Sequence, residues 1–144
     1  MNNETMYAED APYWDTSVRP EKSLGELMAQ LAKFGITRHE VRQGLADAKV
    51  AWLIRFEWHG KAHRFLFVPL SCDQPDKERS FGGARRRYRE QAVFQMGRIA
   101  FYFVKNLLAA AGPQPAALFG FVELPGAFRS DGLPATAAEV EVRG

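Results

Sequence analysis

Six basic side chains gather in a short stretch near the middle of the chain, with Glu78 as the single acid among them. They are Lys77, Arg79, Arg85, Arg86, Arg87 and Arg89. Guanidinium groups match the geometry of phosphate oxygens, and Gly82 and Gly83 leave backbone N–H groups open to an anion. The stretch therefore predicts a site for the phosphate backbone of DNA or RNA, with counterion release supplying affinity. A solvated basic face, or one paired with acidic residues of the chain itself, remains the alternative.

Two aromatic residues lie inside this basic stretch and could stack on nucleic-acid bases. Phe81 precedes the two glycines, and Tyr88 lies among the arginines. A base stacked on either ring would sit beside neutralised phosphates. However, Tyr88 is also in register with Ala92 and Met96, a spacing that favours a place at the outer end of the core.

Other reactive residue types do not form a recognisable site. His59 and His63 flank an expected turn and Cys72 follows the next strand, so zinc ligation is conceivable, but the spacing matches no zinc motif. The segment 80–83 lacks the glycine spacing and the lysine of a phosphate-binding loop. Cys72 has no activating base nearby in the sequence. We therefore expect no catalytic residue, no metal and no cofactor.

The basic stretch leads into a long expected helix between Ala84 and Ala111. Apolar residues recur there every three or four positions, which predicts one broad buried face. The recurring positions are Tyr88, Ala92, Met96, Ile99, Phe103 and Leu107. Four arginines would then occupy the first turn, where the helix dipole disfavours cations by up to about 1 kcal/mol each. We attribute that placement to an anion outside the chain.

The remaining elements predict an α+β fold. A helix is expected from Pro20 to Phe34, with Gly35 as its left-handed cap. A strand is possible over 36–42 and a turn over 44–47. Residues 50–58 alternate strongly, and a hairpin turn at His59-Gly60 leads into a strand over 62–68. Residues 71–83 read as an irregular surface loop, and 119–124 as a last short strand. Together these elements predict a two-layer sandwich, a small antiparallel sheet with two helices on one face.

Composition indicates one ordinary globular domain. The chain has 144 residues, 47% of them hydrophobic and 25% charged. Residues 1–15 contain four acidic and no basic side chains and read as a flexible acidic leader, 16–126 as the domain, and 127–144 as a flexible tail. One cysteine favours a reducing compartment, and no signal peptide or membrane span is visible. We expect a cytoplasmic protein.

Two stretches resemble a loosely defined family of small phage and prophage proteins of no established activity. They are TSVRPEKSLGELMAQLAKFGI at 16–36, with the FLFVPL segment that follows, and REQAVFQMGRIAFYFVKNLLAAAG at 89–112, with ALFGFVELPG after it. At Gly97 the chain departs from the family pattern, which has tryptophan before the arginine matching Arg98. The resemblance implies a phage-like origin and a role in nucleic-acid transactions or in countering a host defence.

These observations predict a non-catalytic phage-type accessory protein that grips nucleic-acid backbone through the arginine-rich start of the long helix. Neutralising about five phosphates predicts a log–log salt slope of about −4.5. The alternative is an inhibitor whose arginines occupy an acidic surface of a host nuclease or defence complex. A homodimer, in which the arginines meet the acidic leader of a neighbouring copy, is a third interpretation.

Overall fold

A computed structural model describes residues 6–46 and 49–143 of the chain. In order, its elements are η1 (Ala8–Asp10), α1 (Pro20–Lys33), β1 (His39–Ala46), β2 (Lys49–Trp58), β3 (Lys61–Phe67), β4 (Glu78–Phe81), β5 (Ala84–Arg87), α2 (Tyr88–Ala111), η2 (Pro115–Phe121), β6 (Glu123–Phe128), β7 (Pro134–Thr136) and α3 (Ala137–Arg143). The predicted α+β fold class is confirmed.

Helix α1 begins and ends where the sequence predicts. Pro20 occupies its first turn, where a missing N–H costs nothing, and the C-terminal cap is followed by Gly35 with a φ of +94°. Leu24, Leu27 and Leu31 form its buried face. The expected apolar stripe is therefore the surface that joins this helix to the core.

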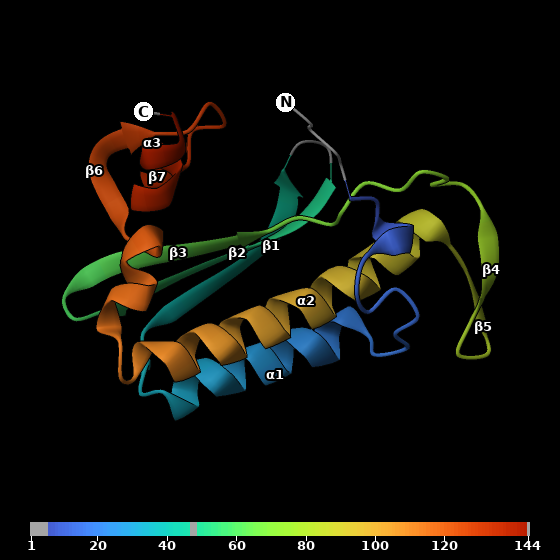
Figure 1. The fold of residues 1–144 in the computed structure, drawn as a ribbon, viewed down its shortest axis with the longest axis horizontal. Helices are drawn as coiled ribbons and strands as arrows, with labels where there is room; N and C mark the ends of the chain where they lie inside the picture. The colour runs from blue at the N-terminus through green and yellow to red at the C-terminus, as the bar shows by residue number, and fades with distance from the viewer. Residues whose placement is uncertain (1–5, 47–48, 144) are drawn as a thin grey trace.

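The main sheet has three antiparallel strands in the order β1-β2-β3 (Figure 1). The turn between β2 and β3 has positive φ at both His59 (52°) and Gly60 (74°), the geometry of a tight two-residue hairpin. Alternation along β2 puts Trp52, Ile54 and Phe56 on the buried face, with at most 3% of each exposed. Strand β1 begins three residues later than predicted and runs through the expected turn at 44–47 as far as Ala46.

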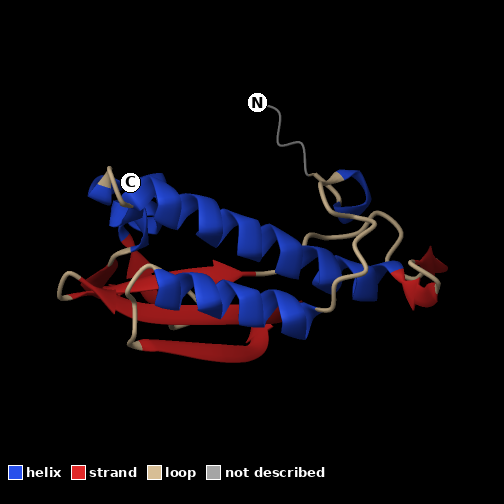
Figure 2. Cartoon of the chain, turned by 90° about the horizontal axis from the view of Figure 1, so that it is seen from below, coloured by secondary structure: helices blue, strands red, loops and turns tan. Residues whose placement is uncertain are grey.

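Both long helices pack on the same face of this sheet, as predicted (Figure 2). Helices α1 and α2 lie side by side and close the core over Trp52, Ile54 and Phe65. The two helices approach closely at Gly97, where an added Cβ would lie 2.9 Å from the Cβ of Ser23. The helix contact at this position therefore requires glycine, which has no Cβ.

The C-terminal segment differs from the expected flexible tail, because β6, β7 and α3 fold against the opposite face of the sheet. Arg64 of β3 lies on the sheet face opposite the two long helices. It is only 2% exposed there and pairs with Glu139 of α3. Its neighbour Arg55 on β2 binds Glu123 of β6 with two hydrogen bonds, at 2.7 and 2.8 Å. Ion pairs thus join the sheet to the end of the chain, and the two-layer sandwich carries a small third element.

Residues 6–15 also differ from the expected loose leader. They lie beside the first half of α2 (Figure 1), where Ala8 and Trp14 are buried. With Phe81, Tyr88 and Ala92 these two residues form a second, smaller apolar cluster. The leader is therefore part of the folded unit from residue 6 onward. Among the described helices, none is both long and apolar enough to cross a membrane.

Candidate nucleic-acid interface

The arginine stretch does not begin the long helix but forms the second strand of a hairpin. Strands β4 and β5 pair in antiparallel register around Gly82 and Gly83, whose φ values are +58° and +86°. Helix α2 begins only at Tyr88. The prediction that Arg85, Arg86 and Arg87 occupy its first turn is therefore wrong, as is the prediction of an irregular loop over residues 78–81.

Loop carbonyls explain why the helix begins at that residue. The Tyr88 N–H donates to the carbonyl of Lys77 at 2.8 Å, and the Arg89 N–H donates to the carbonyl of Pro75 at 3.1 Å. These bonds satisfy donors that a helix start otherwise leaves open. Arg89 is the one arginine of the predicted set in the first turn, and Asp76 pairs with it there. The conflict with the helix dipole therefore reduces to a single, neutralised arginine.

Alternation along the hairpin divides its arginines between two faces. Arg85 and Arg87 lie on one face, opposite Ser80 and Glu78 in the register, and all four residues are exposed. The Glu78 carboxylate lies 3.8 Å from the Arg85 guanidinium, a separation at which an exposed pair gains little. This outward face presents cationic side chains to solvent.

The inward face uses its arginines to hold the hairpin on the fold. The Arg86 guanidinium lies 4.0 Å from the centre of the Phe94 ring, and its Nε donates to Oε1 of Gln91 at 2.8 Å. The Arg79 guanidinium lies 4.2 Å from the centre of the Phe81 ring. Stacking of this kind contributes about 0.5–1 kcal/mol at exposed sites and more when desolvated. Arg86 therefore joins β5 to α2, whereas Arg79 stacks on a ring of its own strand, β4.

The two candidate stacking rings are buried and are not available to a base. Phe81 is 2% exposed and Tyr88 7% exposed, and both pack edge-on against Trp14. The proposal that they stack on bases is therefore wrong. The reason is that the leader, which the sequence leaves unplaced, covers them.

Carboxylates of the chain neutralise part of the basic stretch. Asp15 of the leader pairs with Arg79 and raises its pKa, and Asp76 pairs with Arg89. Within residues 6–46 and 49–143, no carboxylate lies within ion-pair distance of Lys77, Arg86 or Arg87. The exposed cations that can meet an external anion are thus Arg85, Arg87 and Lys77, of which Lys77 also lies with its ammonium 5.7 Å from the centre of the Tyr88 ring.

A second acidic residue of the leader, Glu9, binds backbone instead of arginine. Its two carboxylate oxygens accept the N–H groups of Asp73 and Gln74 at 3.0 and 2.8 Å. Burial opposes its ionisation, but these bonds outweigh that effect and lower its pKa. Because Glu9 and Asp15 are both engaged within the chain, neither supports the interpretation in which the leader binds a neighbouring copy.

Two buried glutamines of α2 position the leader, and sequence reasoning missed them. Gln91 donates to the carbonyls of Trp14 (2.8 Å) and Thr16 (2.7 Å), and Gln95 donates to those of Ala8 (2.8 Å) and Pro12 (3.0 Å). Both side chains have no exposed surface. The signal was present in the sequence, because two amides four residues apart interrupt the apolar face of a helix and need partners when buried.

The other candidate groups do not assemble a reactive site. His63 is buried against Phe56, with its Nδ1 2.9 Å from the Lys61 carbonyl, and burial lowers its pKa. In the described residues, no three histidine, cysteine or acidic side chains come together to hold a metal ion. Burial, and secondly the charge of Glu9, raise the pKa of the Cys72 thiol and keep it protonated.

No protein-family model, curated protein or solved structure matches this chain. The resemblance to phage proteins therefore stays a prediction. The β4–β5 hairpin, which divides its arginines between two faces, is the most specific candidate for a functional site in the described residues.

Proposed function

We propose that this protein binds the phosphate backbone of nucleic acid through the outward face of the β4–β5 hairpin, without catalysis. The observation that supports the proposal is the division of the arginines between two faces. Arg86 stacks on Phe94 of α2 and Arg79 pairs with Asp15 of the leader, while Arg85 and Arg87 project outward. A ribbon whose cations merely improved solubility would not need two further arginines to hold it in place.

The spacing of the outward cations suits a charged polymer. Arg85 and Arg87 are two residues apart on one strand, so their Cα atoms lie about 7 Å apart, and each can reach a different phosphate. Exposed Lys77 precedes the hairpin and adds a third cation. None of these contacts reads a base, so binding should tolerate any sequence.

Because fewer cations of the basic stretch face solvent than the sequence predicts, binding should depend less steeply on salt concentration. Three phosphates neutralised by Lys77, Arg85 and Arg87 give a log–log slope of about −2.7 on duplex DNA, in place of about −4.5 for five. A slope near the larger value would mean that Arg79 and Arg89 leave their carboxylates to bind phosphate. The slope therefore reports how many cations of the basic stretch bind phosphate.

The test compares two double variants on the same labelled duplex and on a single strand. The variant Arg85→Gln/Arg87→Gln should weaken binding and reduce the slope by about 2, because each lost phosphate contact removes about one unit. The control, Arg38→Gln/Arg42→Gln, removes the same amount of positive charge. Its two exposed arginines lie just before β1 and within β1. Fluorescence anisotropy from 50 to 300 mM KCl measures both.

Equal binding by the two double variants would refute the hairpin as the interface, and a flat slope for the parent would refute backbone binding altogether. If the parent binds no polyanion but retains a partner from nuclease-treated host lysate through Arg85 and Arg87, the alternative gains support. In that case the hairpin would occupy an acidic surface of a host nuclease or defence complex. We also propose that the protein is of phage type and acts in the cytoplasm.

A further inference from the structure

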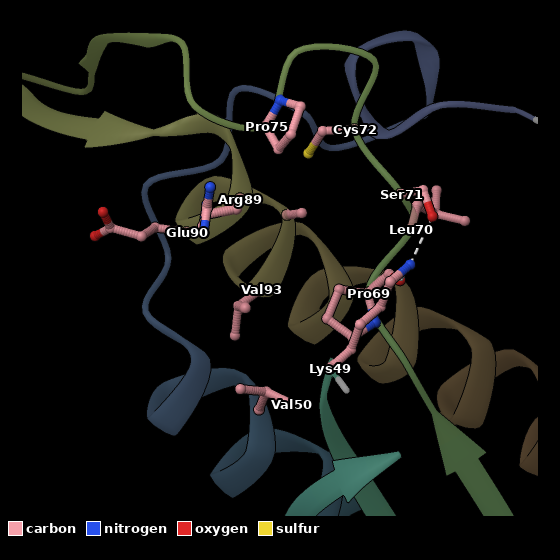
Figure 3. Close-up of a pocket in the computed structure, with 11 residues that line it drawn as sticks. Lys49, Val50, Pro69, Leu70, Ser71, Cys72, Pro75, Arg89, Glu90 and Val93 are labelled. Carbon is pink, nitrogen blue, oxygen red and sulfur yellow. Dashed lines mark hydrogen bonds between the residues drawn. The ribbon is translucent and has the colours of Figure 1, made fainter. Parts of the chain in front are cut away.

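A cavity of about 530 Å³ opens between the start of β2, the segment that follows β3 and the first turns of α2 (Figure 3). Apolar side chains make most of its wall, among them Val50, Leu70 and Val93. Its volume falls within the range of about 300–1,000 Å³ that is typical of ligand sites. No residue of β4 or β5 lines this cavity, so binding at the hairpin does not account for it.

The ammonium group of Lys49 lies at the edge of this cavity. The Lys49 ammonium donates to Oγ of Ser71 at 2.6 Å and to the carbonyl of Pro69 at 3.4 Å. In the described part of the chain, no carboxylate lies within ion-pair distance of it. Among the described residues, two neutral acceptors therefore hold the ammonium, and they use two of its three N–H groups.

The other polar residues of the wall do not cancel this charge. Glu90 directs its carboxylate away from the other lining side chains (Figure 3), and Arg89 is held by Asp76. Cys72 contributes a thiol that burial keeps protonated and neutral. The cavity thus combines an apolar wall with one fixed positive group.

We propose that this cavity binds a small amphipathic anion, a molecule with an aliphatic body and one terminal carboxylate. The body packs on Val50, Leu70 and Val93, and the carboxylate accepts a hydrogen bond from Lys49. Charge complementarity selects this class, because an ammonium that only neutral acceptors hold within residues 6–46 and 49–143 favours an anion over a neutral or cationic analogue of the same length. Neither Lys49 nor Val93 belongs to the hairpin, so this site stands independently of nucleic-acid binding.

The test titrates the full chain with octanoate, octan-1-ol and octylammonium. Two-dimensional NMR measures the binding affinity of each probe. Octanoate should bind about tenfold more tightly than octanol, which corresponds to one charge-assisted hydrogen bond. Octylammonium should bind most weakly. In Lys49→Gln the octanoate affinity should fall about tenfold to that of octanol, while octanol binding stays unchanged. Lys22→Gln, which removes an exposed lysine of α1, is the matched control and should behave like the parent.

Filling the cavity provides a second, independent arm. Val93→Phe should abolish binding of all three probes, and Val93→Met, a smaller change that is easier to accommodate, should weaken it by an intermediate amount. Equal affinity for octanoate and octanol in the parent, or an unchanged octanoate affinity in Lys49→Gln, would overturn the proposal. So would light scattering that finds a dimer in the parent and a monomer in Val93→Met, because the cavity would then be an interface between two copies.

Discussion

Replacing Gln91 with methionine tests the contact on which both the leader and the hairpin depend. Methionine has a similar length and shape but no amide, so the packing volume of this fully buried side chain is nearly conserved. The substitution removes the donor to the carbonyls of Trp14 and Thr16 and the acceptor for Nε of Arg86. The change is therefore confined to hydrogen bonding.

The expected loss follows from the groups left without partners. A buried polar group that loses its partner costs about 1–3 kcal/mol, and two carbonyls are affected, while half-exposed Arg86 can turn to water. We expect the free energy of unfolding to fall by about 3 kcal/mol, roughly a 150-fold change in the folded-to-unfolded ratio. With a urea dependence of about 2 kcal/mol per molar, the midpoint should move down by about 1.5 M.

Urea denaturation measures the loss, and Gln114→Met supplies the control. Gln114 is exposed beyond the end of α2, so its substitution should change stability by less than about 0.5 kcal/mol. Amide hydrogen exchange locates the effect, because the N–H groups of Ala11 and Thr16 bond within the leader and should exchange faster in Gln91→Met. Coincident midpoints for the two variants would refute the role assigned to Gln91.

Two further pairs of substitutions, each a test variant and its control, probe the core. Gly97→Ala should lower the free energy of unfolding by about 1–3 kcal/mol, because the new Cβ meets Ser23, while Gly25→Ala on α1, where nothing lies within 4 Å, should be neutral or stabilising. Equal melting temperatures for these two variants would contradict the close helix contact. Burial lowers the pKa of His63 in the folded protein. As the pH falls below about 6.5, this histidine is therefore protonated in the unfolded chain before it is protonated in the folded one. The free energy of unfolding should then drop by at most about 1.4 kcal/mol per pH unit. Urea midpoints at pH 7.5, 6.5 and 5.5 should show this drop in the parent and in His59→Gln but a smaller one in His63→Gln, and an unchanged pH dependence in His63→Gln would count against it.

The main sandwich could be predicted because its elements carry their own periodicity. The stripe of leucines in α1 and the alternation of Trp52, Ile54 and Phe56 in β2 each indicate both an element and its buried face. Pro20 and Gly35 mark the ends of the first helix. Local pattern and tertiary packing agree in these segments, so no long-range information is needed.

The hairpin could not be predicted from apolar alternation, because its strands contain hardly any. Residues 78–81 and 84–87 are mostly charged or small, and the arginines run directly into a strong helical pattern. The usable signal was Gly82-Gly83, since two adjacent glycines supply the positive φ values of a two-residue hairpin turn. The C-terminal segment was missed for another reason, because its ion pairs join residues about 70 positions apart, as Arg64 and Glu139 do.

The hairpin and the leader are coupled through one side chain, and this coupling explains which arginines face solvent. Gln91 donates through its amide nitrogen to the leader and accepts through its amide oxygen from Arg86. Fixing Arg86 against α2 turns that face of β5 inward, and the two-residue period of a strand then sends Arg85 and Arg87 to the opposite face. The outward cations are therefore a geometric consequence of the inward anchor. A chain that kept both outward arginines but lost the anchor would present the same charges without a fixed spacing between them.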